Sequence, residues 1–71
     1  MRYFFHTADG VEQIDAAGVE FADLRLARAA AVAAFAEILH DLSRLAPERL
    51  SMSVTDKDGL VVSTINLTIS P

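Results

Sequence analysis

Cysteine is absent from this 71-residue chain, and tryptophan is absent as well. Without cysteine, disulfides and thiolate metal sites are excluded as sources of stability. A chain of this length forms one domain, residues 1–71, and buries only about 60% of the surface that its unfolded form exposes. We therefore expect further stability to come from helix packing or from association with a second copy of the chain.

Basic residues are also few. Six Lys and Arg stand against ten Asp and Glu, which gives a net charge of −4 that repels nucleic acid phosphates and anionic lipid. The apolar run near the N-terminus, Tyr3 to Phe5, is much shorter than the hydrophobic part of a signal peptide, and no stretch approaches the length of a membrane span. We therefore expect a cytoplasmic protein that makes no membrane contact and for which nucleic acid binding is disfavoured.

The longest periodic stretch, residues 23–47, predicts one amphipathic helix around which the chain is organised. Asp23 occupies the N-cap position, where its carboxylate accepts bonds from the free N–H groups of the first turn. Pro47 excludes the helical conformation for Ala46, so the helix should end near Leu45. The apolar stripe comprises Leu24, Ala27, Ala31, Phe35, Ile38, Leu42 and Leu45, flanked by Val32 and Leu39.

Residues 2–14 predict a β-hairpin. Asp9-Gly10 is a dipeptide favoured in two-residue type I′ turns, and this turn would place Ala8 opposite Val11. Residues 15–22 would then connect the hairpin to the helix, with Val19 and Phe21 anchored against the core. One face of the hairpin would carry Tyr3, Phe5 and Ile14, and the other Phe4, His6, Ala8 and Val11.

Residues 50–70 predict a second hairpin, whose register follows from matching its apolar faces. A two-residue turn at Asp58-Gly59 keeps apolar residues opposite one another, whereas a three-residue loop would mix the two faces, so we favour the two-residue turn. The resulting pairs are Leu50 with Leu67, Met52 with Ile65 and Val54 with Ser63. The reverse face would carry Ser51, Ser53, Thr55, Val62, Thr64, Asn66 and Thr68.

Together these elements predict an α+β fold. We expect a ββαββ two-layer sandwich, in which one long helix packs on one face of a four-stranded sheet. No helix remains to cover the other face. By this register its apolar members are Phe4, Val11, Leu60 and Val62, and a gathered apolar patch of this kind usually marks an interface.

Several features resemble a known family when they are taken in order. They are RYFFH at residues 2–6, Asp9-Gly10, Asp-x-x-Gly at residues 15–18, the Asp23-Leu24 helix start with its alanine-rich first half, and VTDKDG at residues 54–59. This order is similar to that of short α-proteobacterial, largely rhizobial, proteins classed as a domain of unknown function. The resemblance covers nearly the whole chain and implies a bacterial source and a shared fold. It brings no catalytic residues with it.

Candidates for chemistry are sparse. His6 and His40 lie on separate predicted elements, so we interpret both as structural or solvated. The segment at residues 56–59 begins like a calcium loop, but the remaining ligands and the closing glutamate are missing, which favours a tight turn. We therefore expect no catalytic, cofactor-binding or metal-binding residues, and we predict that the protein is not an enzyme.

The sequence favours a protein-interaction module that forms a homodimer or binds an unknown protein through the uncovered sheet face or an edge strand. One alternative is a binder of single-stranded nucleic acid that stacks bases on an aromatic strand. A further alternative is a small-molecule-binding or minor enzymatic role at a dimer interface, using the Ser/Thr face and His6. The expected contacts are Phe4, Val11, Leu60 and Val62 for the module, and Tyr3, Phe4, Phe5, Arg2 and Arg49 for nucleic acid.

Overall fold

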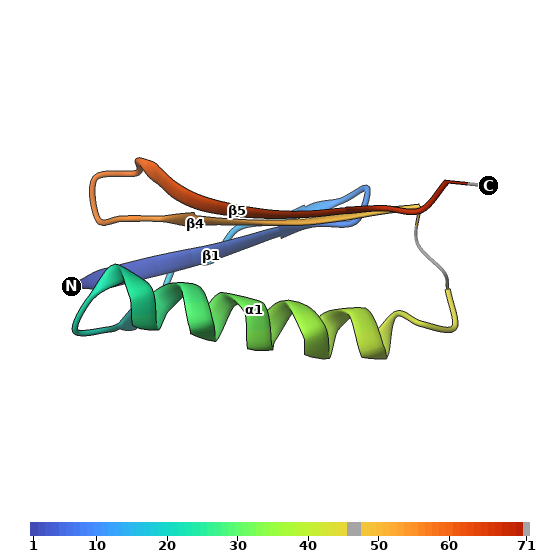
Figure 1. The fold of residues 1–71 in the computed structure, drawn as a ribbon. Helices are drawn as coiled ribbons and strands as arrows, with labels where there is room; N and C mark the ends of the chain where they lie inside the picture. Colours follow the sequence, from blue (N-terminus) through green and yellow to red (C-terminus); the bar gives the residue numbers. More distant parts are fainter. Residues whose placement is uncertain (46–47, 71) are drawn as a thin grey trace.

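The computed structural model describes residues 1–45 and 48–70 of the chain. One helix packs against one face of an open antiparallel sheet, and the opposite face has no helix over it (Figure 1). This arrangement confirms the α+β class and the position of the helix. The elements are β1 (Arg2–Ala8), β2 (Glu12–Gln13), β3 (Val19–Glu20), α1 (Leu24–Asp41), β4 (Arg49–Thr55) and β5 (Val61–Thr68).

The sheet has five strands, which corrects the predicted four. Its order is β2-β1-β4-β5, and β3 pairs with the beginning of β1. Strands β2 and β3 therefore follow one another along the same side of β1. The ββαββ order is only partly matched because the segment predicted as a plain connection contributes a short strand, which pairs with Arg2 and Tyr3.

The core lies between α1 and β4, an interior strand of the sheet. Leu50, Met52 and Val54 on β4 are each at most 2% exposed. They belong to one cluster with the buried helix positions, which recur every fourth residue and so share one face of the helix. Burying side chains of this size stabilises the fold by about 1.5–3 kcal/mol each. The helix contributes Ala27, Ala31 and Phe35, and β1 contributes Tyr3.

The helix begins as predicted. Asp23 has an extended backbone, with φ of −154°, and its Oδ1 accepts the N–H of Leu26 over 3.0 Å. This bond satisfies one of the N–H groups that the first helical turn leaves without an intrahelical partner.

The helix ends at Asp41, which corrects the predicted end near Leu45. The backbone tightens beyond this point, since the N–H of Ser43 donates to the carbonyl of His40, only three residues back. Leu45 is 75% exposed and does not extend the buried stripe. Ala46 and Pro47, on which the predicted end depended, lie outside the described residues. No helix in the described part of the chain is long and apolar enough to cross a membrane.

The first hairpin turns through three residues, Asp9, Gly10 and Val11, which corrects the predicted two-residue turn. Ala8 pairs with Glu12, one position away from the expected partner. The carboxylate of Asp9 accepts the N–H of Val11 over 3.3 Å, and Gly10 takes a φ of 107°. Val11 therefore belongs to the turn, where it is 69% exposed, and not to the uncovered face.

The connection to the helix is anchored by one of the two residues predicted for that role. Phe21 packs its ring 6.4 Å from that of Tyr3 and 6.0 Å from that of Phe5. Val19 is instead 48% exposed on β3, and Ile14, predicted to share the face of Tyr3 and Phe5, is 66% exposed. The error at Ile14 follows from the longer first turn, because Gln13 pairs with Thr7 and Ile14 therefore falls one position away from Phe5. Val19 pairs with Tyr3 in a short strand at the border of the sheet, where it remains exposed.

The body of the second hairpin has the predicted register. Leu50 pairs with Leu67, and the pairs Met52–Ile65 and Val54–Ser63 follow. The turn itself differs from the prediction, because residues 57–59 form a three-residue loop. The N–H of Gly59 donates to the carbonyl of Asp56 over 3.0 Å, and Gly59 has a φ of 83°.

A β-bulge reconciles this longer loop with the predicted pairing. Thr55 pairs with Val61, and one step further Val54 pairs with Ser63, so Val62 is an extra residue in β5. The bulge restores the register that a three-residue loop would have shifted by one. Val62, expected opposite Thr55 on the uncovered face, is half-buried and packs against the core.

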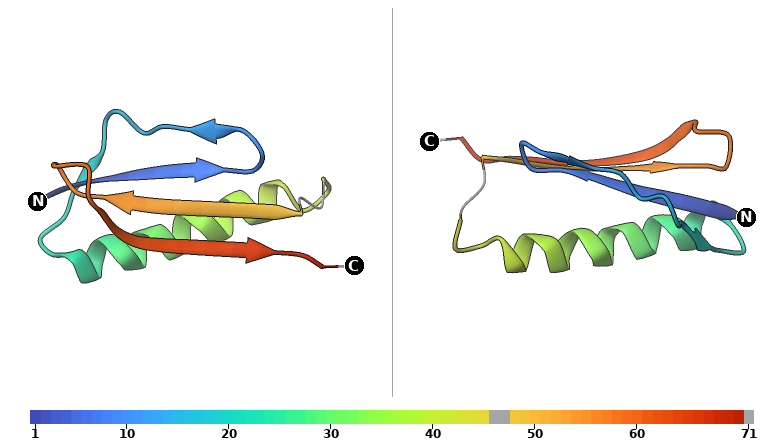
Figure 2. Two further views of the ribbon diagram at one scale, coloured as in Figure 1. Left: turned by 90° about the horizontal axis from the view of Figure 1, so that it is seen from above. Right: turned by 180° about the vertical axis from the view of Figure 1, so that it is seen from behind.

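The helix crosses the sheet obliquely (Figure 2). Seen from above, its first turns lie on the β5 side of the sheet, and its last turns lie beneath β1 and β4. The C-terminal part of β5 consequently lies to one side of the helix and is not directly above it (Figure 2). Leu67 in this part is half-buried, and Ile69, just beyond the strand, is 49% exposed.

Candidate interaction surface

One edge of the sheet is made of two short strands with a side chain bonded to β1 between them. Strands β2 and β3 flank a loop in which the carboxylate of Asp15 accepts N–H groups from Phe5 of β1, from Ala17 and from Gly18, each over 3.1 Å. Asp15 thus replaces a strand carbonyl as the partner of Phe5. Short, irregular strands of this kind are how natural sheets prevent further strands from adding to an edge.

The same N–H donors lower the pKa of Asp15 below its usual value of 3.8. The N–H of Gly18 has the largest effect, followed by that of Phe5, while burial acts in the opposite direction. Smaller lowering effects come from the N–H of Ala17 and from the nearby His6. The loop is therefore organised around an ionised carboxylate, because the hydrogen bonds favour the charged form.

His6 links this loop to β4. The N–H of Asp15 donates to Nδ1 of His6 over 3.1 Å, and Nε2 lies 3.0 Å from the hydroxyl oxygen of Thr55. Because Nδ1 is an acceptor, the neutral ring carries its proton on Nε2 and donates it to Thr55. Both ring nitrogens therefore make structural hydrogen bonds. His40 is exposed on the helix, in the other layer of the fold.

Gly18 lets the loop lie close against β1. Its φ is 69°, in the left-handed region that favours glycine. A Cβ at this position would come within 2.9 Å of the ring of Phe4 and of the Cγ of Arg2. The Asp-x-x-Gly pattern at residues 15–18 thus has a physical explanation: the aspartate gathers N–H groups, and the glycine permits close contact.

The four residues predicted to form an interface do not gather into one patch. Phe4 is half-buried beside Gly18, and Val62 packs against the core. Val11 and Leu60 are 69% and 65% exposed, but they belong to the two hairpin turns, which lie at opposite ends of the sheet (Figure 1). The wrong turn lengths misplaced Val11 and Val62, whereas the separation of the two hairpin turns follows from the strand arrangement, which the sequence did not predict.

The aromatic run of β1 is divided between two faces. Tyr3 is 3% exposed and Phe5 packs against the core, so both lie on the helix side, whereas Phe4 lies on the other face. Arg2 is within 3.5 Å of Glu20, and Arg49 begins β4 at the far end of the sheet. The aromatics and arginines proposed for stacking and binding nucleic acid therefore do not share one surface.

Strand β5 forms the second edge of the sheet. Its eight residues, VVSTINLT, include no charged residue and no proline. The N–H of Ile69 donates to the carbonyl of Glu48, the residue just before β4, over 2.9 Å. In an antiparallel pair, alternate residues point both backbone groups to the same neighbour. The backbone groups that point outward from this edge consequently belong to the exposed residues Thr64, Asn66 and Thr68.

The face without a helix is mostly hydroxyl-bearing beside β5, as predicted. Ser53 pairs with Thr64, and Ser51 pairs with Asn66. Both serines are half-buried, whereas Thr64 and Asn66 are exposed. An uncharged edge strand bordered by such a face is a template on which another strand can pair.

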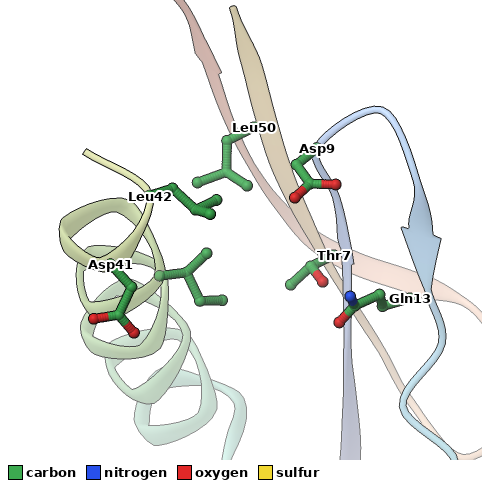
Figure 3. Close-up of a pocket in the computed structure, with 7 residues that line it drawn as sticks. Thr7, Asp9, Gln13, Asp41, Leu42 and Leu50 are labelled. Atoms are coloured by element: carbon green, nitrogen blue, oxygen red, sulfur yellow. The ribbon is translucent and has the colours of Figure 1, made fainter. Parts of the chain in front are cut away.

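A small hollow lies between the last turns of α1 and the sheet (Figure 3). Its volume is about 230 Å³, below the roughly 300–1,000 Å³ of most ligand pockets. Asp41 of the helix and Asp9 at the end of β1 lie on opposite sides of it (Figure 3), and its lining includes no basic side chain. Within residues 1–45 and 48–70, no group of three His, Cys, Asp or Glu side chains is placed to hold a metal ion. The remaining lining residues are Thr7, Gln13, Ile38, Leu42 and Leu50.

The model of one protein family matches residues 2–68, which include all five strands and the helix. The chain belongs to DUF6894, a domain of unknown function. Comparisons of this DUF6894 domain with curated proteins and with solved structures gave no match. The family brings no ligand or partner with it, so the function of this DUF6894 domain is inferred from its surfaces.

Proposed function

We propose that this protein is a non-catalytic interaction module that self-associates by strand addition at the β5 edge. The observation that carries the proposal is the contrast between the two edges of the sheet. One edge consists only of the two-residue strands β2 and β3, with Asp15 bonded to β1 between them, whereas β5 directs the backbone groups of Thr64, Asn66 and Thr68 outward from a longer, uncharged strand. Monomeric proteins usually protect such an edge with charge, proline or a short strand. The bulge at Val62 protects only the beginning of β5.

Apolar surface beneath β5 supports the same proposal. Ala34 and Ile38 line the hollows on the β1 side of the helix. Val32 and Leu39 are seven residues apart, so they share the opposite flank of α1, on the β5 side. Val32 is 61% exposed and Leu39 is half-buried. A strand added at β5 brings its own lower face to this flank, so apolar burial accompanies the new hydrogen bonds.

Proline at position 64 tests the proposal. The N–H of Thr64 points away from β4, so Thr64→Pro removes a donor that an added strand needs and leaves the bonds to β4 in place. We expect the unaltered protein to form dimers that dissociate on dilution, as measured by light scattering. Thr64→Pro should remain a monomer at every concentration while keeping the helical circular dichroism of the unaltered protein.

Glu12→Pro is the matched control on the other edge. The N–H of Phe5 points toward that edge, so by alternation Gln13 bonds to Thr7 and the N–H of Glu12 points outward. The Glu12→Pro variant should associate as the unaltered protein does. A Thr64→Pro variant that still dimerises, or an unaltered protein that is monomeric throughout, contradicts the proposal.

A further inference from the structure

We infer that the strand added at the β5 edge is β5 of a second copy, antiparallel, with the twofold axis passing through Asn66. The inference rests on the proposed function and specifies which residues of the two β5 strands lie opposite one another in the dimer. Most homodimers are symmetric, and two identical antiparallel strands are related by a twofold axis perpendicular to the sheet. Such an axis continues the sheet from one copy into the next and places both helices on the same face.

The two faces of β5 restrict where the axis can lie. Thr64 and Asn66 lie on the hydroxyl-bearing face, and Ile65 lies on the helix side with the residues that pack against the core. Residues opposite one another in a sheet share a face. An axis between two residues would set Ile65 opposite a polar residue of the other face, so the axis passes through a residue.

Among these axes, Asn66 gives the best pairing. Ile65 lies opposite Leu67 of the second copy, and this apolar pair occurs twice because of the symmetry. Thr64 likewise lies opposite Thr68 twice, and the amides of the two Asn66 side chains meet at the axis, where each can donate and accept.

The neighbouring axes give poorer matches. An axis through Leu67 pairs only residues 66–68 of β5 with one another, because the strand ends at Thr68, whereas the axis through Asn66 pairs residues 64–68 and sets Ser63 only opposite Ile69, which lies beyond the strand. An axis through Ile65 sets Ser63 opposite Leu67, and an axis through Thr64 sets Ser63 opposite Ile65, so each places a hydroxyl opposite an apolar residue within the strand. Both also bring the bulge at Val62 into the paired region, where it interrupts the ladder. The axis through Asn66 pairs residues 63–69 with one another and leaves the bulge outside this stretch.

Charge also favours self-pairing along this strand. Residues 61–68 carry none, so no like charges meet across the twofold axis. The flanks that hold Val32 and Leu39 face each other beneath the seam, because both helices lie on one side of the joined sheet. A strand of a second copy therefore matches the β5 edge in hydrogen bonding, in polarity and in charge.

Single cysteines test the register, since the natural chain has none. Asn66→Cys should form a disulfide-linked dimer under mild oxidation, because directly opposite Cα atoms in a bonded antiparallel pair lie about 5.5 Å apart, within the range for disulfides. Thr64→Cys alone should not cross-link, because its symmetry mate lies four residues along the strand, about 13 Å away. Thr68→Cys alone should not cross-link for the same reason.

A mixture of the Thr64→Cys and Thr68→Cys chains should cross-link, because these positions are opposite each other. Cross-linking of Thr64→Cys alone overturns the axis at Asn66. Absence of cross-linking both in Asn66→Cys and in the mixture overturns it as well, if the unaltered protein dimerises and Thr64→Pro does not. The proposed function survives in both cases. An unaltered protein that is monomeric at every concentration overturns the register and the proposed function together.

Discussion

Thr55 pairs with Val61, and Val62 is left as the extra residue of a β-bulge. The bulge brings Val62 against the core, where it is half-buried, while its neighbour Val61 remains 60% exposed. The two adjacent valines therefore differ in what they contribute. Val62 contributes to packing, and Val61 contributes to the surface.

Lysine at these two positions should separate the two roles. Val62→Lys should lower the free energy of unfolding by about 1–2 kcal/mol, because a partly buried apolar group is replaced by one that must reach water. Val61→Lys should change it by less than about 0.5 kcal/mol. Urea denaturation of both variants measures the difference. Equal destabilisation would show that the bulge is misplaced.

Alanine at Gly18 should be more damaging than alanine at Gly59. Both glycines have a positive φ, 69° and 83°, so alanine costs about 1–2 kcal/mol of backbone strain at either position. Only at Gly18 does the added Cβ meet other atoms, at 2.9 Å, whereas the space at Gly59 is open. The midpoint of urea unfolding should fall further for Gly18→Ala. Similar midpoints for the two variants would contradict the close contact with Phe4.

Asp15 should make stability depend on pH in the acid range. Its folded pKa lies below the 3.8 of the unfolded chain, so the ionised carboxylate contributes stability fully above that value. The contribution is lost as the pH falls through the folded pKa. Asp15→Asn should lower the free energy of unfolding at neutral pH by about 1–2 kcal/mol and flatten its dependence on pH below about 4.

Glu12→Gln is the control for Asp15→Asn, because it removes the same charge from an exposed position on β2. This variant should keep the neutral-pH stability and the acid dependence of the unaltered protein. Chemical denaturation at a series of pH values gives both curves. If the two variants lose stability in parallel, net charge and not the hydrogen bonds of Asp15 explains the effect.

The hydroxyl of Thr55 should hold the tautomer of His6. Thr55→Val removes the acceptor for Nε2–H and should lower the free energy of unfolding by about 1 kcal/mol. Thr64→Val, an exposed change on the same face, should have little effect at a dilution where the protein is monomeric. Nitrogen-15 NMR of the ring should report the Nε2–H form in the unaltered protein, and a dominant Nδ1–H form would rule out the bond from Asp15.

Salt should strengthen self-association. Each copy carries a net charge of −4, while the β5 seam carries none, so charge opposes the dimer only at long range. Raising the ionic strength from about 0.01 M to about 0.15 M shortens the Debye length from roughly 30 to 8 Å and should lower the dimer Kd several-fold. Sedimentation at the two salt concentrations measures it. A Kd that rises with salt would indicate an interface built on ion pairs.

Local patterns in the sequence determined the elements with the strongest periodicity. The helix start at Asp23 and the pairing of Leu50 with Leu67 were predictable, because a cap needs only the next turn of chain and an apolar face must stay on one side of a strand. The turns were not. The carboxylate of Asp9 accepts the backbone N–H of Val11, two residues ahead, and this bond accompanies a three-residue turn. The preference of Asp-Gly for two-residue turns does not take such a side-chain bond into account.

The tertiary structure alone decided which strand ends the sheet. The sequence indicated that Thr64, Asn66 and Thr68 are polar and share one face, but strand order depends on contacts between distant segments, such as that of His6 with Thr55. Strand β4 lies between β1 and β5, and among the strands that the structure describes β5 has no neighbour other than β4, so β5 forms an edge. The composition of each strand is local, whereas its place in the sheet is set by the packing of the whole chain.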